Sequence, residues 1–397
     1  MLAIDPDNVI GMYYYAKTLT QMNRSKEAEA LYHKITVQGP AFEAAWLGLA
    51  ALYETQKKYD DAIGVYRRYL EINPARISFR VKIADLLVKS NKQEAAEKEF
   101  QEVLKMDSAN REVRTALGLL YYDMHRFDAA AVQFLSLLET APNDDKLHYL
   151  LANALEQKGD LPAARVAYQK ISTVFELYAN AQIHTAMIFK KEGRLDDAIL
   201  VLTQAIQKKN DQAILYLYLS SLYEEQKNFA VAEKTVLEGI GRFPRNADLH
   251  YVRGSILEKM NRFEESIKSM ETVLDIDPQN ADALNFIGYS YADRGIHLDR
   301  AEQMIVQALK IKPDNGYILD SLGWVHFKKN QYDSALKHLK RARQLLPGDA
   351  NIMEHLGDVY LKIGQDKEAL EQYRNAVKID SDNSALKKKL DALIDKK

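Results

Sequence analysis

The sequence predicts an all-α protein: a solenoid of about eleven helical hairpins followed by a C-terminal capping helix. Apolar residues recur at spacings of three and four along the whole chain, which is the period of helices and not of strands. The chain also aligns with itself when it is written in rows of about 34 residues. Such rows, each contacting only its neighbours, are typical of a solenoid rather than of two or three globular domains.

Eleven rows can be aligned, and an extra residue in the ninth, near Ile296–Asp299, shifts the last two. The rows begin at Val9, Glu43, Ile77, Arg111, Asp145, Ala179, Ala213, Ala247, Ala281, Gly316 and Ala350. We therefore expect eleven repeats over residues 9–383. Residues 1–8 would be the last turn of a truncated upstream repeat. We therefore expect that the chain starts in the middle of a repeat and that the sequence upstream of Met1 has been removed. Residues 384–397, with apolar residues four apart among lysines, predict a capping helix that covers the last apolar face.

Each row carries small residues where two helices would meet. An apolar residue at the seventh place precedes a small one at the eighth, as in Leu49-Ala50, Leu117-Gly118 and Leu322-Gly323. The residue at the twentieth place is also small. A bulky residue there would overpack the hairpin and lower its stability by about 1–3 kcal/mol. Between the helices, a Gly, Asn, Lys or His predicts a left-handed residue that closes the first helix. Proline at the thirty-second place, as in Pro142, ends many of the second helices.

This pattern resembles the tetratricopeptide repeat family over essentially the whole chain. The resemblance implies antiparallel helix pairs that stack into a right-handed superhelix, with the first helix of each pair lining the concave face. A stretch in the ninth and tenth rows, Ala283–Leu339, further resembles bacterial envelope members of the family, including outer-membrane lipoproteins. Some of those act as adaptors of a carboxyl-terminal processing protease, which implies a periplasmic or outer-membrane-associated location. A cytoplasmic location is the alternative.

Composition excludes several classes of function. The net charge is -2 and the pI is about 6.5, so no broad basic field predicts a nucleic-acid partner. The absence of cysteine excludes disulfides and thiolate metal sites. No apolar run is long enough to span a bilayer. No phosphate loop, HExxH or GxSxG motif occurs, and the nine histidines are scattered, so each is assigned a packing or solvated role. We therefore expect no enzymatic activity and no cofactor.

The candidate site is the aromatic-rich late part of the groove that the resemblance implies. There, the second, fifth, ninth and twelfth places of a row would face the groove. Exposed aromatic residues among polar neighbours are typical anchors for a bound peptide. The predicted partner-binding residues are Tyr251, Asp282, Asn285, Tyr289, Tyr317, Asp320, Trp324 and Phe327. For Trp324 two interpretations stay open: it anchors a partner, or it packs against the following hairpin and stiffens the superhelix.

One familiar ligand of the family does not fit the residues. Chaperone-binding members hold a free C-terminus with a clamp of Lys, Asn, Asn, Lys and Arg on consecutive first helices. Asn153 matches one clamp place, but Tyr149 replaces the lysine of its row, and no three consecutive rows complete the set. The ligand is therefore not expected to be a simple chaperone-type C-terminus.

Three functions fit the sequence. The first is a protein-binding scaffold or adaptor that holds an extended or helical partner segment, an envelope protease among the candidate partners. The second is a self-assembling structural scaffold that forms a homo-oligomer. The third is the regulatory region of a larger protein.

Overall fold

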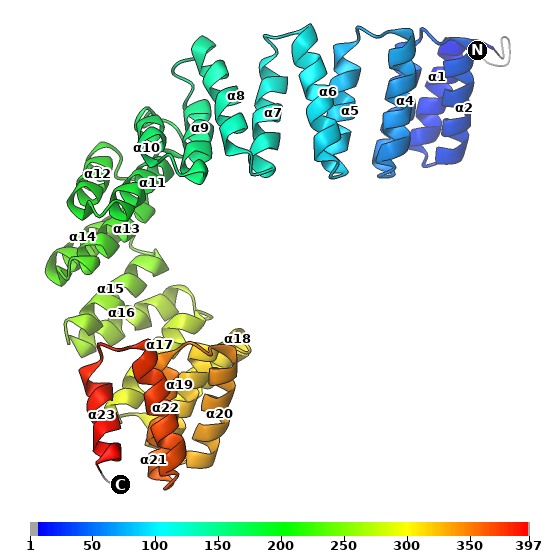
Figure 1. Ribbon diagram of the computed structural model, residues 1–397. Helices are drawn as coiled ribbons and strands as arrows, with labels where there is room; N and C mark the ends of the chain where they lie inside the picture. Colours follow the sequence, from blue (N-terminus) through cyan, green and yellow to red (C-terminus); the bar gives the residue numbers. More distant parts are fainter. Residues whose placement is uncertain (1–6, 396–397) are drawn as a thin grey trace. The chain divides into compact units, whose positions relative to one another are not determined.

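The structure, a computed structural model, describes residues 7–395, and every regular element in that range is an α-helix (Figure 1). The chain divides into two units, Met1–Glu192 and Gly193–Lys397. The expected end of an upstream repeat at residues 1–8 lies largely outside the described residues, and the division of the chain at residues 8 and 383 stays a prediction, as does the handedness of the superhelix. Within each unit consecutive helices pack against one another, so the predicted all-α solenoid class is confirmed.

The helices alternate between first and second members of a hairpin. Those of the first unit are α1 (Val9–Gln21), α2 (Ser25–Gln38), α3 (Glu43–Thr55), α4 (Tyr59–Ile72), α5 (Ile77–Lys89), α6 (Gln93–Met106), α7 (Arg111–Asp123), α8 (Phe127–Thr140), α9 (Asp145–Lys158), α10 (Leu161–Gln169) and α11 (Tyr178–Lys191). Those of the second unit are α12 (Leu195–Lys208), α13 (Ala213–Glu225), α14 (Phe229–Arg242), α15 (Ala247–Lys259), α16 (Phe263–Ile276), α17 (Ala281–Arg294), α18 (Leu298–Ile311), α19 (Gly316–Lys328), α20 (Tyr332–Leu345), α21 (Ala350–Lys362), α22 (Asp366–Ile379) and α23 (Ser384–Ile394).

Local sequence starts and ends these helices at the same phase of the repeat. An Asn or Asp immediately before many first helices accepts a hydrogen bond from a backbone N–H of the first turn. These caps are Asn8, Asn110, Asp144, Asn246, Asn280, Asn315, Asp349 and, before the last helix, Asn383. Each satisfies an amide that the helix leaves unpaired, which stabilises the helix by about 0.5–2 kcal/mol.

The predicted left-handed residue closes the first helix of every pair. Positive φ occurs at the fifteenth place of all eleven rows, at Asn23, Lys57, Asn91, His125, Gly159, Gly193, Lys227, Asn261, Gly295, Asn330 and Gly364. The prediction is therefore confirmed. The extra residue of the ninth row falls in the turn between α17 and α18, where His297 takes a second left-handed conformation with φ 51°.

The small residues at the eighth place lie where the two helices of a hairpin approach most closely. A Cβ added to Gly118 would lie 2.6 Å from the Phe134 ring, and one added to Gly323 would lie 2.5 Å from Leu339 Cγ. The small residues at the twentieth place, Ala130 and Ala335 among them, are fully buried. Contact this close between helices explains why both places stay small.

Helix α10 is the one second helix that stops early. It has nine residues, whereas the other second helices have fourteen. After it, Ser172 donates its backbone N–H to Asp145 Oδ1 at 2.8 Å and its hydroxyl to Asp145 Oδ2. The β-branched Ile171, Thr173 and Val174 around this serine disfavour helix, so the chain reaches α11 through a turn-rich segment.

A matched pair of glycine substitutions tests the close approach. Gly64 lies in α4 with no atom within 4 Å of an added Cβ, so Gly64→Ala should raise the free energy of unfolding by about 0.5–1 kcal/mol through helix propensity. Gly323→Ala should lower it by about 1–3 kcal/mol, because Leu339 is fully buried and cannot move aside. Urea unfolding followed by circular dichroism measures both, and a rise for Gly323→Ala would contradict the proposed packing.

Candidate functional site

The eight predicted site residues lie on three first helices of the second unit. Tyr251 lies on α15, and the others lie on α17 and α19. On α19, Tyr317, Asp320 and Trp324 are spaced by three and four residues, so they share one face of the helix.

These residues differ in how far they reach solvent. Tyr317 is 59% exposed and Asp282 is exposed, whereas Tyr251, Asn285, Tyr289 and Phe327 are half-buried. Asp320 and Trp324 are buried, each 8% exposed. The predicted set therefore contains an outer layer that reaches solvent and an inner layer that is buried.

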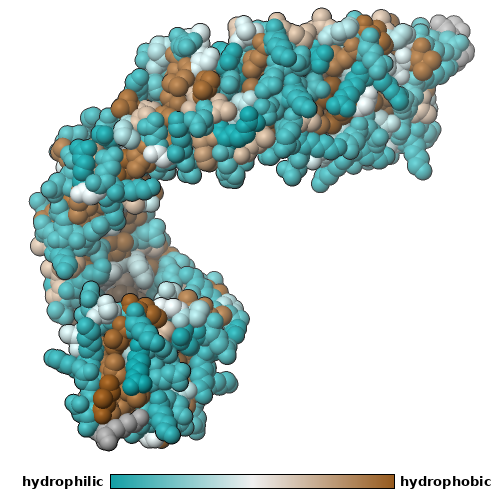
Figure 2. Space-filling view, viewed as in Figure 1, coloured by the Kyte–Doolittle hydropathy of each residue, from teal (hydrophilic) through white to brown (hydrophobic). Residues whose placement is uncertain are grey.

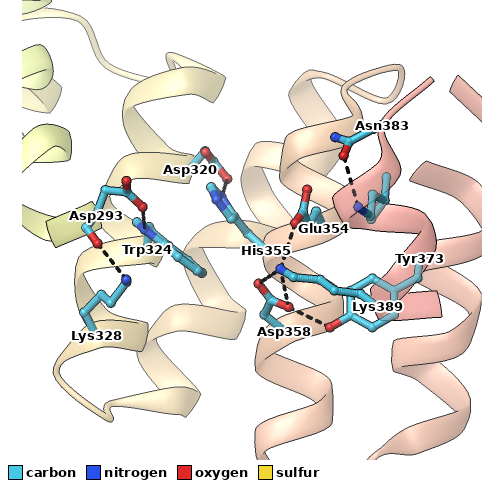
Figure 3. Close-up of polar contacts among 11 residues, drawn as sticks. Asp293, Asp320, Trp324, Lys328, Glu354, His355, Asp358, Tyr373, Asn383 and Lys389 are labelled. Atoms are coloured by element: carbon cyan, nitrogen blue, oxygen red, sulfur yellow. Dashed lines mark hydrogen bonds and ion pairs between the residues drawn. The ribbon is translucent and has the colours of Figure 1, made fainter. Parts of the chain in front are cut away.

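Trp324 links three consecutive first helices (Figure 3). Its ring stacks on His355 of α21 with centroids 4.1 Å apart, and on Phe327 at 4.8 Å. Its indole N–H donates to Asp293 Oδ1 of α17 at 3.3 Å. Lys328 Nζ lies 4.8 Å from the ring centroid and donates to the carbonyl oxygen of Asp293. Of the two interpretations that the sequence left open, packing against the following hairpin describes Trp324 in this structure.

Beside Trp324, a buried ion pair joins α19 to α21. The Nδ1 of His355 donates to Asp320 Oδ1 at 2.9 Å, and both side chains are nearly inaccessible to solvent. Burial alone would lower the pKa of His355, but the carboxylates of Asp320, Asp358 and Glu354 raise it above its ordinary value. The sequence assigned His355 a packing or solvated role and did not connect it with Asp320, because the two residues meet only when adjacent hairpins stack.

A second polar network attaches the last helix. Lys389 of α23 lies 2.7 Å from Glu354 and 2.7 Å from Asp358, and the Tyr373 hydroxyl donates to Asp358 at 2.6 Å. Burial would lower the pKa of Lys389, but its two carboxylate partners raise it. Burial and Asp358 raise the pKa of Tyr373, so its hydroxyl stays protonated as a donor. Sequence reasoning expected α23 to cap by apolar contact, and this network anchors it as well.

The half-buried tyrosines stand among carboxylates. Burial is the main reason that the pKa of Tyr289 is raised, and the nearby Asp293, Asp320 and Glu354 raise it further. Tyr251 packs edge-to-face on Phe286, and its pKa is also raised by burial. The ring of Tyr289 lies 6.4 Å from that of His355. The face therefore combines aromatic rings with acidic groups, a combination suited to binding part of another protein through apolar and polar contacts.

Asn285 carries an unused polar atom on this face. Its Oδ1 is buried and accepts no hydrogen bond from the described residues. At the rim, Asp282 pairs with Lys312 of α18 at 2.7 Å, and Arg294 pairs with Glu258 at 2.8 Å. In residues 7–395 no three His, Asp or Glu side chains are grouped to hold a metal ion.

The first unit carries a separate polar cluster at the junction of α9, α10 and α11. The Tyr168 hydroxyl lies 2.5 Å from Asn153 Oδ1 and 2.8 Å from Glu156 Oε2, two acceptors that share its single proton, while His184 Nδ1 lies 2.9 Å from Glu156. The rings of Tyr168 and His184 stack with centroids 5.1 Å apart. Asn153, the residue that matches one place of a chaperone clamp, is thus engaged within the chain.

The two layers of the site predict different effects of substitution. Trp324→Ala should lower the free energy of unfolding of the second unit by about 3–5 kcal/mol, because it removes a buried ring and leaves a cavity. Tyr317→Ala should change it by about 0.5 kcal/mol or less, because that ring is mostly solvated. Equilibrium unfolding in urea measures both. Equal effects of the two substitutions would contradict the layered description.

The His355–Asp320 pair predicts a pH dependence of stability. The folded-state pKa of His355 is raised above its unfolded value, so the pair stabilises fully below about pH 6.5 and this stabilisation is lost as pH rises through the folded pKa. Carbon-13 NMR of the imidazole should give a pKa above 6.5, and Asp320→Asn should lower it. His355→Gln should flatten the fall in unfolding free energy over the same pH range. A His355 pKa below 6.5 would contradict the prediction.

Comparisons with known proteins agree with this geometry. One tetratricopeptide repeat model matches residues 53–120, 190–256 and 326–393, together more than half of the 397 residues. Two further models of the same description match residues 16–77 and 115–173, and residues 247–280. In residues 7–395 no helix is long and apolar enough to cross a membrane.

Among curated proteins, a TPR repeat-containing protein of Pseudomonas aeruginosa is 30% identical over 199 residues, which cover 50% of this chain and 34% of that protein. The human protein O-mannosyl-transferase TMTC3 is 22% identical, over 82% of this chain and 38% of its own length. The chain thus spans about a third of the length of these relatives.

Among solved structures, a tetratricopeptide repeat protein from Parabacteroides merdae superposes with a TM-score of 0.51 at 15% identity, covering 66% of this chain and 98% of that one. At this identity the likeness concerns the fold alone. Repeat phase, capping and turn geometry, and matches to family models over more than half its length all agree: the chain belongs to the tetratricopeptide repeat family.

Proposed function

We propose that this chain is a protein-binding scaffold or adaptor that holds segments of partner proteins against the first helices of its second unit. Tetratricopeptide repeat proteins generally serve as protein-interaction scaffolds. The observation that carries the proposal is that one exposed aromatic residue, Tyr317, and four half-buried residues lie on the consecutive first helices α15, α17 and α19; the half-buried residues are Tyr251, Asn285, Tyr289 and Phe327. In this proposal the outer residues touch the partner, and Trp324 and Asp320 hold them in place from beneath.

The partner would meet both apolar and polar groups. The half-buried tyrosines offer ring surface at low conformational entropy cost, as anchors at protein interfaces do. Asp282 at the rim is exposed and can accept hydrogen bonds from a partner's backbone or side chains. No group on this face is arranged for a chemical step, and the proposed role is binding without catalysis.

We further propose that the partner belongs to the bacterial envelope, with a carboxyl-terminal processing protease as one candidate. Support comes from the resemblance of Ala283–Leu339 to envelope members of the family. The relative from Pseudomonas aeruginosa is bacterial and is also a tetratricopeptide repeat protein. Because the chain spans about a third of that relative, the second candidate function is the regulatory or docking region of a longer protein.

A pull-down with single exposed substitutions tests the site without disturbing the fold. Wild-type protein, Tyr317→Ala and the control Tyr14→Ala serve as baits for a bacterial envelope extract, with quantitative mass spectrometry of the retained proteins. Tyr14 is the matched control because it is 62% exposed on α1 of the other unit. Tyr317→Ala should lose about tenfold or more of a specific partner that the other two baits retain.

Two results would refute the assignment. If all three baits retain the same partners to the same extent, the binding site lies elsewhere on the chain. If the chain retains only further copies of itself, and light scattering shows a mass that rises with concentration, self-assembly is the better account.

A further inference from the structure

The first unit carries an apolar trough between two of its second helices. Helices α8 and α10 form its walls and α9 its floor, and the space is about 670 Å³. Its apolar lining includes Val132, Leu135, Leu138, Leu151, Leu155 and Val166. Figure 2 shows hydrophobic surface gathered over the part of the unit that holds α8 to α10. We call this feature the α8–α10 trough.

The walls of the trough expose large apolar side chains to solvent. Val132 is 59% exposed, Leu135 50% and Val166 54%. Exposed apolar residues that line one depression mark interaction sites more often than isolated ones do. The three residues come from two different helices, so the patch is a product of the stacking of consecutive hairpins.

The fold itself does not require apolar residues here. Val132 and Val166 both stand at the twenty-second place of their rows, and the same place carries Lys98, Lys234 and Lys268 in other hairpins, all exposed. A charged side chain is therefore compatible with the hairpin at this place. The apolar residues of α8 and α10 need another explanation than packing within the chain.

The chemistry of the walls selects the kind of segment that fits. The walls are helices, whose backbone N–H and C=O groups are bonded within the helix, so they cannot pair with the backbone of an extended segment. An extended segment would bury unpaired backbone groups against Val and Leu side chains, which is costly. An amphipathic helix satisfies its own backbone and presents apolar side chains at i, i+3, i+4 and i+7.

Charges at the two ends of the trough favour one orientation of a bound helix. Asp128 and Asp160 lie where α8 and α10 begin, and Lys158 between them pairs with Asp128 at 2.6 Å, which leaves the acidic charge in excess. Lys170 lies at the opposite end, after α10. A helix with a basic residue at one end and an acidic residue at the other would complement both ends.

We propose that the α8–α10 trough is a docking site for an amphipathic helix of a partner protein. The helix is three to four turns long, to match the fourteen residues of α8. Its apolar stripe covers Val132, Leu135 and Val166, and its basic end lies toward Asp128 and Asp160. The site is independent of the binding face proposed for the second unit, and neither proposal needs the other to hold.

A peptide-selection experiment on the full chain tests this site. A displayed library of random peptides about four helical turns long is selected on wild-type protein and counter-selected on Val132→Lys/Val166→Lys. The double substitution copies the lysines found at this place in other hairpins, so the fold should be kept, which circular dichroism checks. The charge-matched control is Val37→Lys/Leu237→Lys, at exposed positions of α2 and α14 outside the trough.

The expected result is a set of proline-free peptides with apolar residues at i, i+3, i+4 and i+7 that gain helicity when they bind. Their affinity should fall about tenfold or more on the trough variant and stay unchanged on the control. Failure to select peptides that distinguish wild type from the trough variant would overturn the proposal, as would selected peptides that bind in an extended form. Sedimentation showing a wild-type dimer that the trough variant abolishes would assign the trough to a second copy of this chain.

Discussion

Every level of this structure depends on the close approach of the two helices in each hairpin. The approach is permitted by small residues. A Cβ added at Gly118 would lie 2.6 Å from the Phe134 ring, and one added at Gly323 would lie 2.5 Å from Leu339 Cγ, closer than two non-bonded atoms can approach. Because each hairpin presents the same closely packed faces to the next, one packing solution is repeated along each unit. A binding surface on such a scaffold is built from residues at equivalent places in successive hairpins.

The two proposed surfaces use different faces of that scaffold. The face in the second unit lies on first helices and combines half-buried tyrosines with carboxylates, whereas the α8–α10 trough lies on second helices and is mainly apolar. The first suits a segment that makes polar as well as aromatic contacts. The second suits a segment that has already satisfied its own backbone.

The inner layer beneath the first surface makes it rigid. Trp324 touches residues of α17, α19 and α21, and its ring stacks on His355 of the His355–Asp320 pair. A buried ion pair contributes little to stability unless its geometry is good and its remaining atoms are bonded. The main contribution of this pair is to position the hairpins, because the pair and the stacked rings fix how one hairpin lies on the next. The acidic groups around Lys389 extend the same arrangement to α23.

The sequence alone determined the helices, their phase and the chemistry of their ends. Repeat spacing predicted where small residues would meet, and one residue per row predicted the left-handed turn that the structure confirms at Lys57 and His125 as well as at the glycines. These features are local, so each depends on a few neighbouring residues. The early end of α10 was not predicted, because the β-branched residues after it act together with a tertiary contact, the hydrogen bonds of Ser172 to Asp145 of α9.

Only the tertiary structure decided which residues of the site reach solvent. Tyr317 and Trp324 lie on one face of α19 and look alike in the sequence, yet Tyr317 is solvated and Trp324 is covered by His355 of the next hairpin. The exposed trough between α8 and α10 was equally hidden in the sequence, because its walls belong to different rows. The physical reason is the same in both cases: exposure of a side chain in a solenoid is set by the hairpin stacked beside it, and that neighbour lies about 34 residues away.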